Sequence, residues 1–153
     1  MITDSILRLS QMKDSLDKPR LTELPTIHDP RGCLSFLQSA GPKAALPFEI
    51  ARVYWIFDNR GSHEHSGRAL KSCTEFVVAL SGSCVLDLES IDGQRQSVRL
   101  TRADKGVVIP SGTWREIKEI STNAVLLVVC SSEYKPEEII RDYEEFRQWT
   151  SRN

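Results

Sequence analysis

From Leu21 onward, the chain consists of short apolar runs separated by turn signals such as Asp29-Pro30-Arg31-Gly32 and Asp92-Gly93. The runs are rich in β-branched and aromatic residues and follow one another at intervals of about ten residues. This spacing is typical of a sandwich or barrel rather than of alternating βαβ units. We therefore predict an all-β jelly-roll barrel with strands over 52–58, 76–80, 84–88, 96–100, 107–109 and 125–130.

The two ends of the chain have a helical pattern instead. Apolar residues recur at helical spacing from Ile2 to Leu16, and Pro19 ends the pattern, so residues 1–20 are an extension that forms either a short amphipathic helix or a frayed tail. Near the C-terminus, Pro136 suits a first helical position and is followed by two glutamates that favour a helix start. We predict a short helix over 136–150 that packs on the domain of residues 21–135.

Composition narrows the class of protein further. A chain of 153 residues with 40% hydrophobic residues can bury one core, and its formal charge of -1 creates no field toward nucleic acid or an anionic membrane. The longest apolar run, 124–130, is too short for a membrane span, and the N-terminus lacks the layout of a secretory signal. We expect a cytoplasmic protein whose four widely spaced cysteines act as small apolar residues.

Several separated motifs, covering about Leu21 to Trp149, resemble one known family. They are 28–32 (HDPRG), 47–58 (PFEIARVYWIFD), 76–83 (FVVALSGS), 106–110 (GVVIP), 113–116 (TWRE) and 140–146 (IRDYEEF). On these residues the chain resembles the cupin-type sugar-nucleotide 3,4-ketoisomerases, which act on TDP-4-keto-6-deoxyglucose. The resemblance is stronger for fold than for activity, because activity depends on the site rather than on the barrel.

The resemblance implies a cupin barrel, usually a homodimer, that binds a thymidine-diphosphate sugar at its mouth and needs no metal or other cofactor. The reaction that it implies moves a ketone from carbon 4 to carbon 3 of the hexose through an enediolate, in deoxysugar and surface polysaccharide biosynthesis. Removing and returning a proton near neutral pH suits histidine. The family has two such histidines in a motif of the form Arg-Gly-x-His-Ala-His-Lys.

Two alignments of that motif are open in this chain. An ungapped alignment from Arg52 to Glu75 puts Arg68 and Leu70 at the two histidine positions, and neither side chain can act as a histidine base. Arg68 could still hold a phosphate or a carbonyl oxygen. The other alignment matches the motif itself at 60–65 (RGSHEH) and makes His63 and His65 the catalytic pair, at the cost of two compensating length changes.

The composition of the same segment supports a simpler interpretation of these histidines. Residues 58–67 are turn-like and almost without apolar side chains, which favours a solvated loop that exposes His63 and His65. A metal site is not expected, because metal-binding cupins usually add a third histidine from a late strand and no histidine follows His65.

Five further residues are candidates for the site. By strand alternation Arg52 and Tyr54 share a face, where Arg52 could contact pyrophosphate or sugar and Tyr54 could relay a proton. Glu75 could act as a carboxylate base, or it could simply pair with Lys71 or Arg115. Trp114 and Arg115 are candidate substrate contacts, although core packing suits Trp114 better.

Three functions remain open on the sequence alone. The chain could be a ketoisomerase that uses His63 and His65. It could instead be a non-catalytic nucleotide-sugar-binding or regulatory homologue, with Arg68 and Leu70 in place of the catalytic histidines. Lastly, it could be an interaction module that has lost the ligand.

Overall fold

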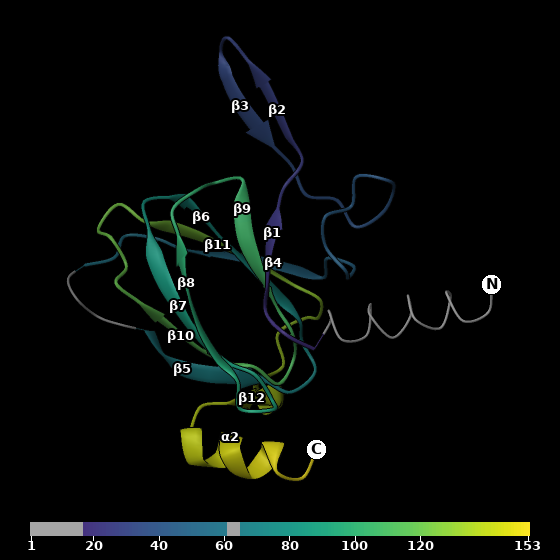
Figure 1. The fold of residues 1–153 in the computed structure, drawn as a ribbon, viewed down its shortest axis with the longest axis vertical. Helices are drawn as coiled ribbons and strands as arrows, with labels where there is room; N and C mark the ends of the chain where they lie inside the picture. The colour runs from purple at the N-terminus through teal and green to yellow at the C-terminus, as the bar shows by residue number, and fades with distance from the viewer. Residues whose placement is uncertain (1–16, 61–64) are drawn as a thin grey trace.

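The computed structural model describes residues 17–60 and 65–153, in which two five-stranded antiparallel sheets face each other (Figure 1). The first sheet has the order β1 (Arg20–Glu23), β9 (Lys105–Ile109), β6 (Glu75–Ser81), β11 (Val125–Cys130) and β4 (Arg52–Ile56). The second has the order β12 (Ile139–Ile140), β5 (His65–Leu70), β10 (Trp114–Lys118), β7 (Cys84–Glu89) and β8 (Arg95–Leu100).

The main core fills the space between the sheets. Strand alternation sends every second side chain inward, so Val77 and Val128 from the first sheet meet Leu86 and Ile117 from the second. The all-β, cupin-like prediction is confirmed. Among the described residues, however, no ladder joins one sheet to the other, so the fold is an open two-sheet jelly roll rather than a closed barrel.

All six predicted strands are present as β4, β6, β7, β8, β9 and β11. The segment expected as a loop forms strand β5 from His65 onward, paired with β10. The prediction from composition missed this strand because Ser66, Gly67 and Arg68 carry no apolar pattern. Gly67 is required there, since a Cβ atom at this position would lie 2.3 Å from the Trp114 ring.

The C-terminal helix is shorter than predicted. Residues 136–138 form a 3-10 turn, η1 (Pro136–Glu138), and Ile139 and Ile140 then pair with Leu70 and Ala69 of β5. Helix α2 (Tyr143–Thr150) begins only after Asp142, whose carboxylate accepts a hydrogen bond from the Glu145 backbone N–H. Pro136 and the two glutamates after it thus begin the 3-10 turn, and Glu144 and Glu145 form the acidic first turn of α2.

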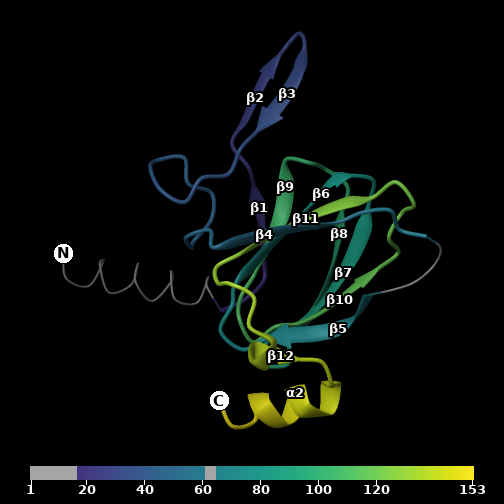
Figure 2. The same cartoon turned by 180° about the vertical axis from the view of Figure 1, so that it is seen from behind.

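A two-stranded hairpin, β2 (Thr26–Asp29) and β3 (Gly32–Ser35), projects away from both sheets (Figures 1 and 2). Its turn lies at the predicted Asp29-Pro30-Arg31-Gly32. The following segment crosses the outer face of the first sheet, where Phe48 and Ile50 pack against Phe76 and Val129. The prediction of a helix or tail over residues 1–20 falls mostly outside the described residues. In the part of the chain that the structure covers, no helix has the length and apolarity of a membrane span.

Candidate functional site

A cavity of about 270 Å³ opens between edge strand β4 of the first sheet and strands β5 and β10 of the second. We call it the arginine cavity, because three of its side chains are arginines. Its lining residues are Tyr54, Ile56, Ser66, Arg68, Arg115, Ile117 and Arg141.

Strand register brings the polar residues of the cavity together. Arg68 and Arg115 are direct partners in the β5–β10 ladder, so their side chains leave the second sheet on the same face. Tyr54 comes from β4 across the gap, on the inner face that alternation predicts, and Val53 and Trp55 point outward. Glu75 begins β6 behind the cavity, opposite Cys130 in the β6–β11 ladder.

The Glu75 carboxylate is the centre of this group and is almost completely buried. Its Oε1 accepts hydrogen bonds from the Tyr54 hydroxyl at 3.2 Å and from Arg68 Nη2 at 2.9 Å. Arg115 Nη1 lies 3.4 Å from Oε2, within ion-pair range but without hydrogen-bond geometry. Glu75 is therefore paired within the protein, and its role as a base remains a prediction.

Tyr54 lies between the two arginines and the glutamate. Arg68 Nη2 donates to its hydroxyl oxygen, and Arg115 Nη2 lies 3.4 Å from the same atom. Burial is the largest influence and raises the pKa of Tyr54, while the positive charge of Arg115 opposes it. The phenol consequently stays protonated near neutral pH and acts as a donor to Glu75.

The arginines keep donors that the described part of the chain does not use. Arg68 Nε and Arg115 Nη1 are buried and have no hydrogen-bond partner among the described residues. The side chain of Arg115 is 6% exposed and that of Arg68 is 20% exposed. Buried donors of this kind cost free energy until a ligand or water accepts from them.

Arg52 supports the cavity from outside its lining. Its guanidinium lies 5.4 Å from the ring centroids of both Tyr54 and Tyr134, and its Nη2 donates to Cys130 Sγ at 3.4 Å. A cation between two aromatic rings restrains both of them. Arg52 thus positions Tyr54, and its predicted contact with a ligand remains a prediction.

The structure separates the two candidate alignments only in part. Arg68 lines the cavity, as the ungapped alignment predicts, whereas Leu70 lies in the core cluster and outside the cavity lining. His65 begins β5, where its backbone pairs with Ile117 after a shift in register from the Arg68–Arg115 pair. His63 lies outside the described residues, so its catalytic role stays a prediction.

Trp114 faces away from the arginine cavity. It precedes Arg115 on β10 and therefore points to the opposite side of the sheet, where its ring centroid lies 5.4 Å from those of Tyr143 and Phe146 of α2. Trp114 and Arg115 therefore do not face the same cavity and would not contact one ligand together there.

The sequence analysis assigned no site role to the remaining lining residues. Ile56 and Ile117 form an apolar wall, and Ser66 and Arg141 add polar groups at the opening. Arg141 comes from the segment between β12 and α2, and only the tertiary fold brings it to the cavity. The side chains described here include no cluster of three or more His, Cys, Asp or Glu residues that could hold a metal ion.

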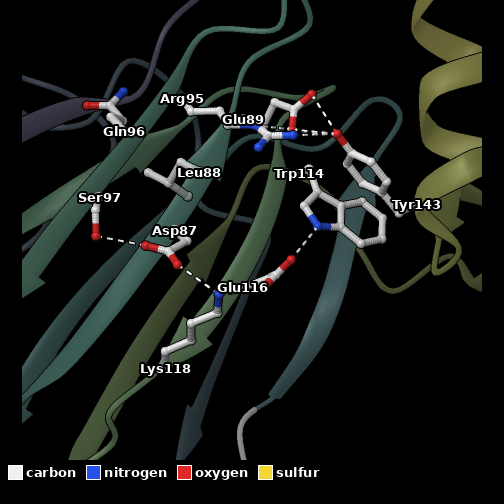
Figure 3. A pocket seen from close by; sticks show the side chains of 10 residues that line it. All are labelled: Asp87, Leu88, Glu89, Arg95, Gln96, Ser97, Trp114, Glu116, Lys118 and Tyr143. Carbon is white, nitrogen blue, oxygen red and sulfur yellow. Dashed lines mark hydrogen bonds and ion pairs between the residues drawn. The ribbon is translucent and has the colours of Figure 1, made fainter.

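A second, larger hollow of about 510 Å³ lies on the outer face of the second sheet, beside α2 (Figure 3). We call it the outer groove, and Trp114 and Tyr143 form one end of it. The buried Glu89 carboxylate accepts hydrogen bonds there from Tyr143 at 2.9 Å, Arg95 at 2.9 Å and Arg147 at 3.0 Å. These contacts attach α2 to strands β7 and β8 of the second sheet.

Further along the outer groove, the polar groups also pair with one another. Ser97 donates to Asp87 at 2.7 Å, Lys118 bridges Asp87 and Glu116, and the Trp114 indole N–H donates to Glu116 at 3.1 Å (Figure 3). Because these side chains pair with one another, we interpret the polar lining of the outer groove as a network that stabilises the fold.

Comparison with known proteins shows the family to which this chain belongs. The family model FdtA, described as WxcM-like, C-terminal, matches residues 17–151. The chain is 31% identical over 127 residues to the TDP-4-oxo-6-deoxy-alpha-D-glucose-3,4-oxoisomerase of Aneurinibacillus thermoaerophilus, covering 82% of this chain and 88% of that protein.

Solved structures agree. The WlaRB TDP-quinovose 3,4-ketoisomerase of Campylobacter jejuni is 35% identical with a TM-score of 0.78, over 85% of this chain and 97% of that one. QdtA, a sugar 3,4-ketoisomerase of Thermoanaerobacterium thermosaccharolyticum solved with TDP, is 26% identical with a TM-score of 0.81, over 90% and 97%. The chain is thus a cupin that resembles the TDP-sugar 3,4-ketoisomerases, and it belongs to the FdtA family.

Proposed function

We propose that this protein binds a thymidine-diphosphate sugar in the arginine cavity and acts in deoxysugar biosynthesis as a 3,4-ketoisomerase. The observation that carries the proposal is the convergence of Tyr54, Arg68 and Arg115 on an open cavity in a member of the FdtA family. Relatives named for TDP-sugar isomerisation, and the QdtA structure with TDP, support the ligand class.

Arginine suits the charged part of such a ligand. Its guanidinium donates two parallel hydrogen bonds to phosphate oxygens. Arg141 is exposed at the opening, which suits a diphosphate that stays partly in solvent. The sugar would then enter toward Arg68, Arg115 and Tyr54.

Isomerisation needs a group that accepts the carbon-3 proton and a group that delivers a proton to carbon 4, while the carbon-3 hydroxyl becomes the new ketone. We assign the two proton transfers at carbon to His63 and His65, and we assign to Tyr54 the donation of a proton to the carbon-4 oxygen and the acceptance of the proton that leaves the carbon-3 hydroxyl. Among the described cavity residues, Glu75 is occupied by Tyr54 and Arg68 and therefore does not compete for this role.

Binding without turnover is the second candidate, and one observation favours it. Arg68 points into the cavity and Leu70 into the core, the two positions where the ungapped alignment puts the family's histidines. An arginine that stays protonated cannot accept the carbon-3 proton.

Proton NMR of TDP-4-keto-6-deoxyglucose in deuterated water distinguishes the two candidates. Deuterium exchange at carbon 3 and a 3-keto product, both lost in a His63→Ala/His65→Ala variant and kept in His28→Ala, would establish the isomerase. His28 lies on the exposed hairpin and is the matched control. Ligand line broadening without exchange would instead establish binding alone, and the absence of both would overturn the proposal.

We also propose a homodimer in the cytoplasm. Val53 and Trp55 of edge strand β4 and Phe57 just after it are exposed, and such an apolar strip along an edge strand is typical of a protein interface. The free cysteines suit a reducing compartment. Sedimentation velocity tests the dimer. Trp55→Ser should weaken it, and Ile91→Ser, at an exposed position in the turn between β7 and β8, should not. A wild-type monomer would contradict the proposal.

A further inference from the structure

We propose that Arg68 and Arg115 form an oxyanion subsite at the inner end of the arginine cavity, which binds an anionic oxygen carried by the hexose. The inference rests on the proposed nucleotide-sugar binding and specifies the chemistry of the sugar end. Two sources supply such an oxygen: a carboxylate on the hexose, or the enediolate that forms during isomerisation.

The charges around the cavity are unbalanced. Arg68, Arg115 and Arg141 line it, and the acidic group in contact with this set is Glu75, which lies behind the lining. Glu75 carries one charge and is shared by two arginines. At least one buried positive charge is therefore uncompensated by the described residues, and a buried cation without a counter-charge is costly.

Unused donors lie on the same two side chains. Arg68 Nε and Arg115 Nη1 are buried and lack hydrogen-bond partners among the described residues, as does Arg52 Nε outside the lining. Arg115 Nη1 also lies 3.4 Å from Glu75 Oε2, in ion-pair range. Arg115 is more than nine-tenths buried and lines the cavity. An anion held there would accept from donors that are already in place, with little reorganisation of the protein.

The position of these donors distinguishes them from a diphosphate site. Arg141 is exposed at the opening, whereas Arg115 is buried deep between the sheets. Positive charge thus lies at two depths in the cavity, which suits two separate anionic groups of one ligand. With the diphosphate at the outer level, the inner pair is left for the sugar.

The neighbouring groups support a negative ligand rather than a neutral ketone. Tyr54 is a protonated phenol held by both arginines, and Ile56 and Ile117 form the apolar part of the lining. A low-dielectric wall strengthens the attraction between the guanidinium groups and an anionic oxygen. A neutral ketone would accept hydrogen bonds but would leave the charge uncompensated.

The first test uses the small sugars D-glucuronate and D-glucose, so that it does not depend on nucleotide binding. Saturation-transfer NMR and thermal denaturation should show binding of glucuronate to the wild-type protein, at least roughly tenfold tighter than binding of glucose. Arg68→Met should remove this preference, and Arg68→Lys should retain part of it because the charge remains. Arg99→Met, an exposed arginine paired with Glu119, is the charge-matched control and should leave the preference unchanged.

Equal binding of glucuronate and glucose, or a preference that Arg68→Met leaves intact, would exclude a carboxylate as the source. The second test then asks whether the subsite binds the enediolate. Arg68→Lys should slow carbon-3 deuterium exchange in TDP-4-keto-6-deoxyglucose by tenfold or more without weakening TDP binding. If exchange is absent or unchanged as well, the oxyanion subsite is overturned. The proposed nucleotide binding is tested separately by measuring the binding of TDP alone. That result depends neither on a preference for glucuronate nor on carbon-3 exchange.

Discussion

Glu75 and Glu89 are two buried carboxylates, each bound by one tyrosine and two arginines, and they stabilise different regions of the molecule. Glu89, on the outer face, is paired with Arg95 and Arg147, whose side chains are 72% and 46% exposed. The arginines of Glu75 are instead buried in the cavity, with donors that lack partners among the described residues. The same set of groups therefore has two roles. On the outer face it attaches α2 to the sheet in contact with solvent, and in the cavity it leaves positively charged donors without hydrogen-bond partners.

Replacing each glutamate by glutamine tests this difference most strongly. Glu75→Gln leaves two buried guanidinium groups without a counter-charge, so we expect the free energy of unfolding to fall by about 3–5 kcal/mol. Glu89→Gln should cost about 1–2 kcal/mol, because water can solvate its exposed arginines. Urea denaturation measures both values. Equal losses would mean that the two regions are energetically alike.

Packing beneath the outer groove gives the next largest effect. A Cβ atom on Gly67 would overlap the Trp114 ring, so Gly67→Ala should destabilise the protein by about 1–3 kcal/mol. Ser66→Ala, one residue away on the cavity side, should change stability by less than about 0.5 kcal/mol. Thermal denaturation compares the pair, and a neutral Gly67→Ala would show that Trp114 moves freely.

Removing one hydroxyl from each glutamate site is a milder comparison. Tyr54→Phe should cost about 1 kcal/mol, since the hydroxyl both donates to Glu75 and accepts from Arg68. Tyr143→Phe should cost less, because Glu89 keeps its bonds to Arg95 and Arg147, and exposed Arg95 can bond to water in place of Tyr143. Denaturant midpoints provide the measurement, and the reverse order would contradict the assignment of the cavity as the drier region.

The smallest expected effect concerns alkaline pH. Burial raises the pKa of Tyr54 in the folded state, whereas in the unfolded chain it takes the ordinary value of about 10. The stability that Tyr54 contributes is therefore fully present below pH of about 10 and is lost as the pH rises through the folded-state pKa. Tyr54→Phe should flatten this part of the stability profile, and an unchanged slope would contradict the raised pKa.

Much of the fold could be predicted from local pattern. The six strands with β-branched or aromatic runs are present, and the alternation of Arg52 and Tyr54 with Val53 and Trp55 gives the observed faces. Strand β5 could not be predicted in this way, because its residues are polar and small and its pairing partner β10 lies far along the chain. The helix start was misplaced for a related reason: Ile139 and Ile140 have a tertiary partner that local propensity does not reveal.

The site was predictable residue by residue but not as an assembly. The sequence suggested Tyr54, Arg68, Glu75 and Arg115 one at a time, and the fold brings all four together. It also suggested Trp114, which the same strand turns to the other face. Arg141 lies in the 140–146 motif, but no site role could be assigned to it from the sequence, since that role depends on where the segment before α2 crosses the cavity opening.

Leu70 restricts which substitutions the fold tolerates at this position. It lies in the apolar core cluster at 7% exposure. A histidine introduced there would bury an imidazole among mainly apolar side chains and would lack a ready polar partner. Such a substitution would therefore lower stability before it could contribute any chemistry.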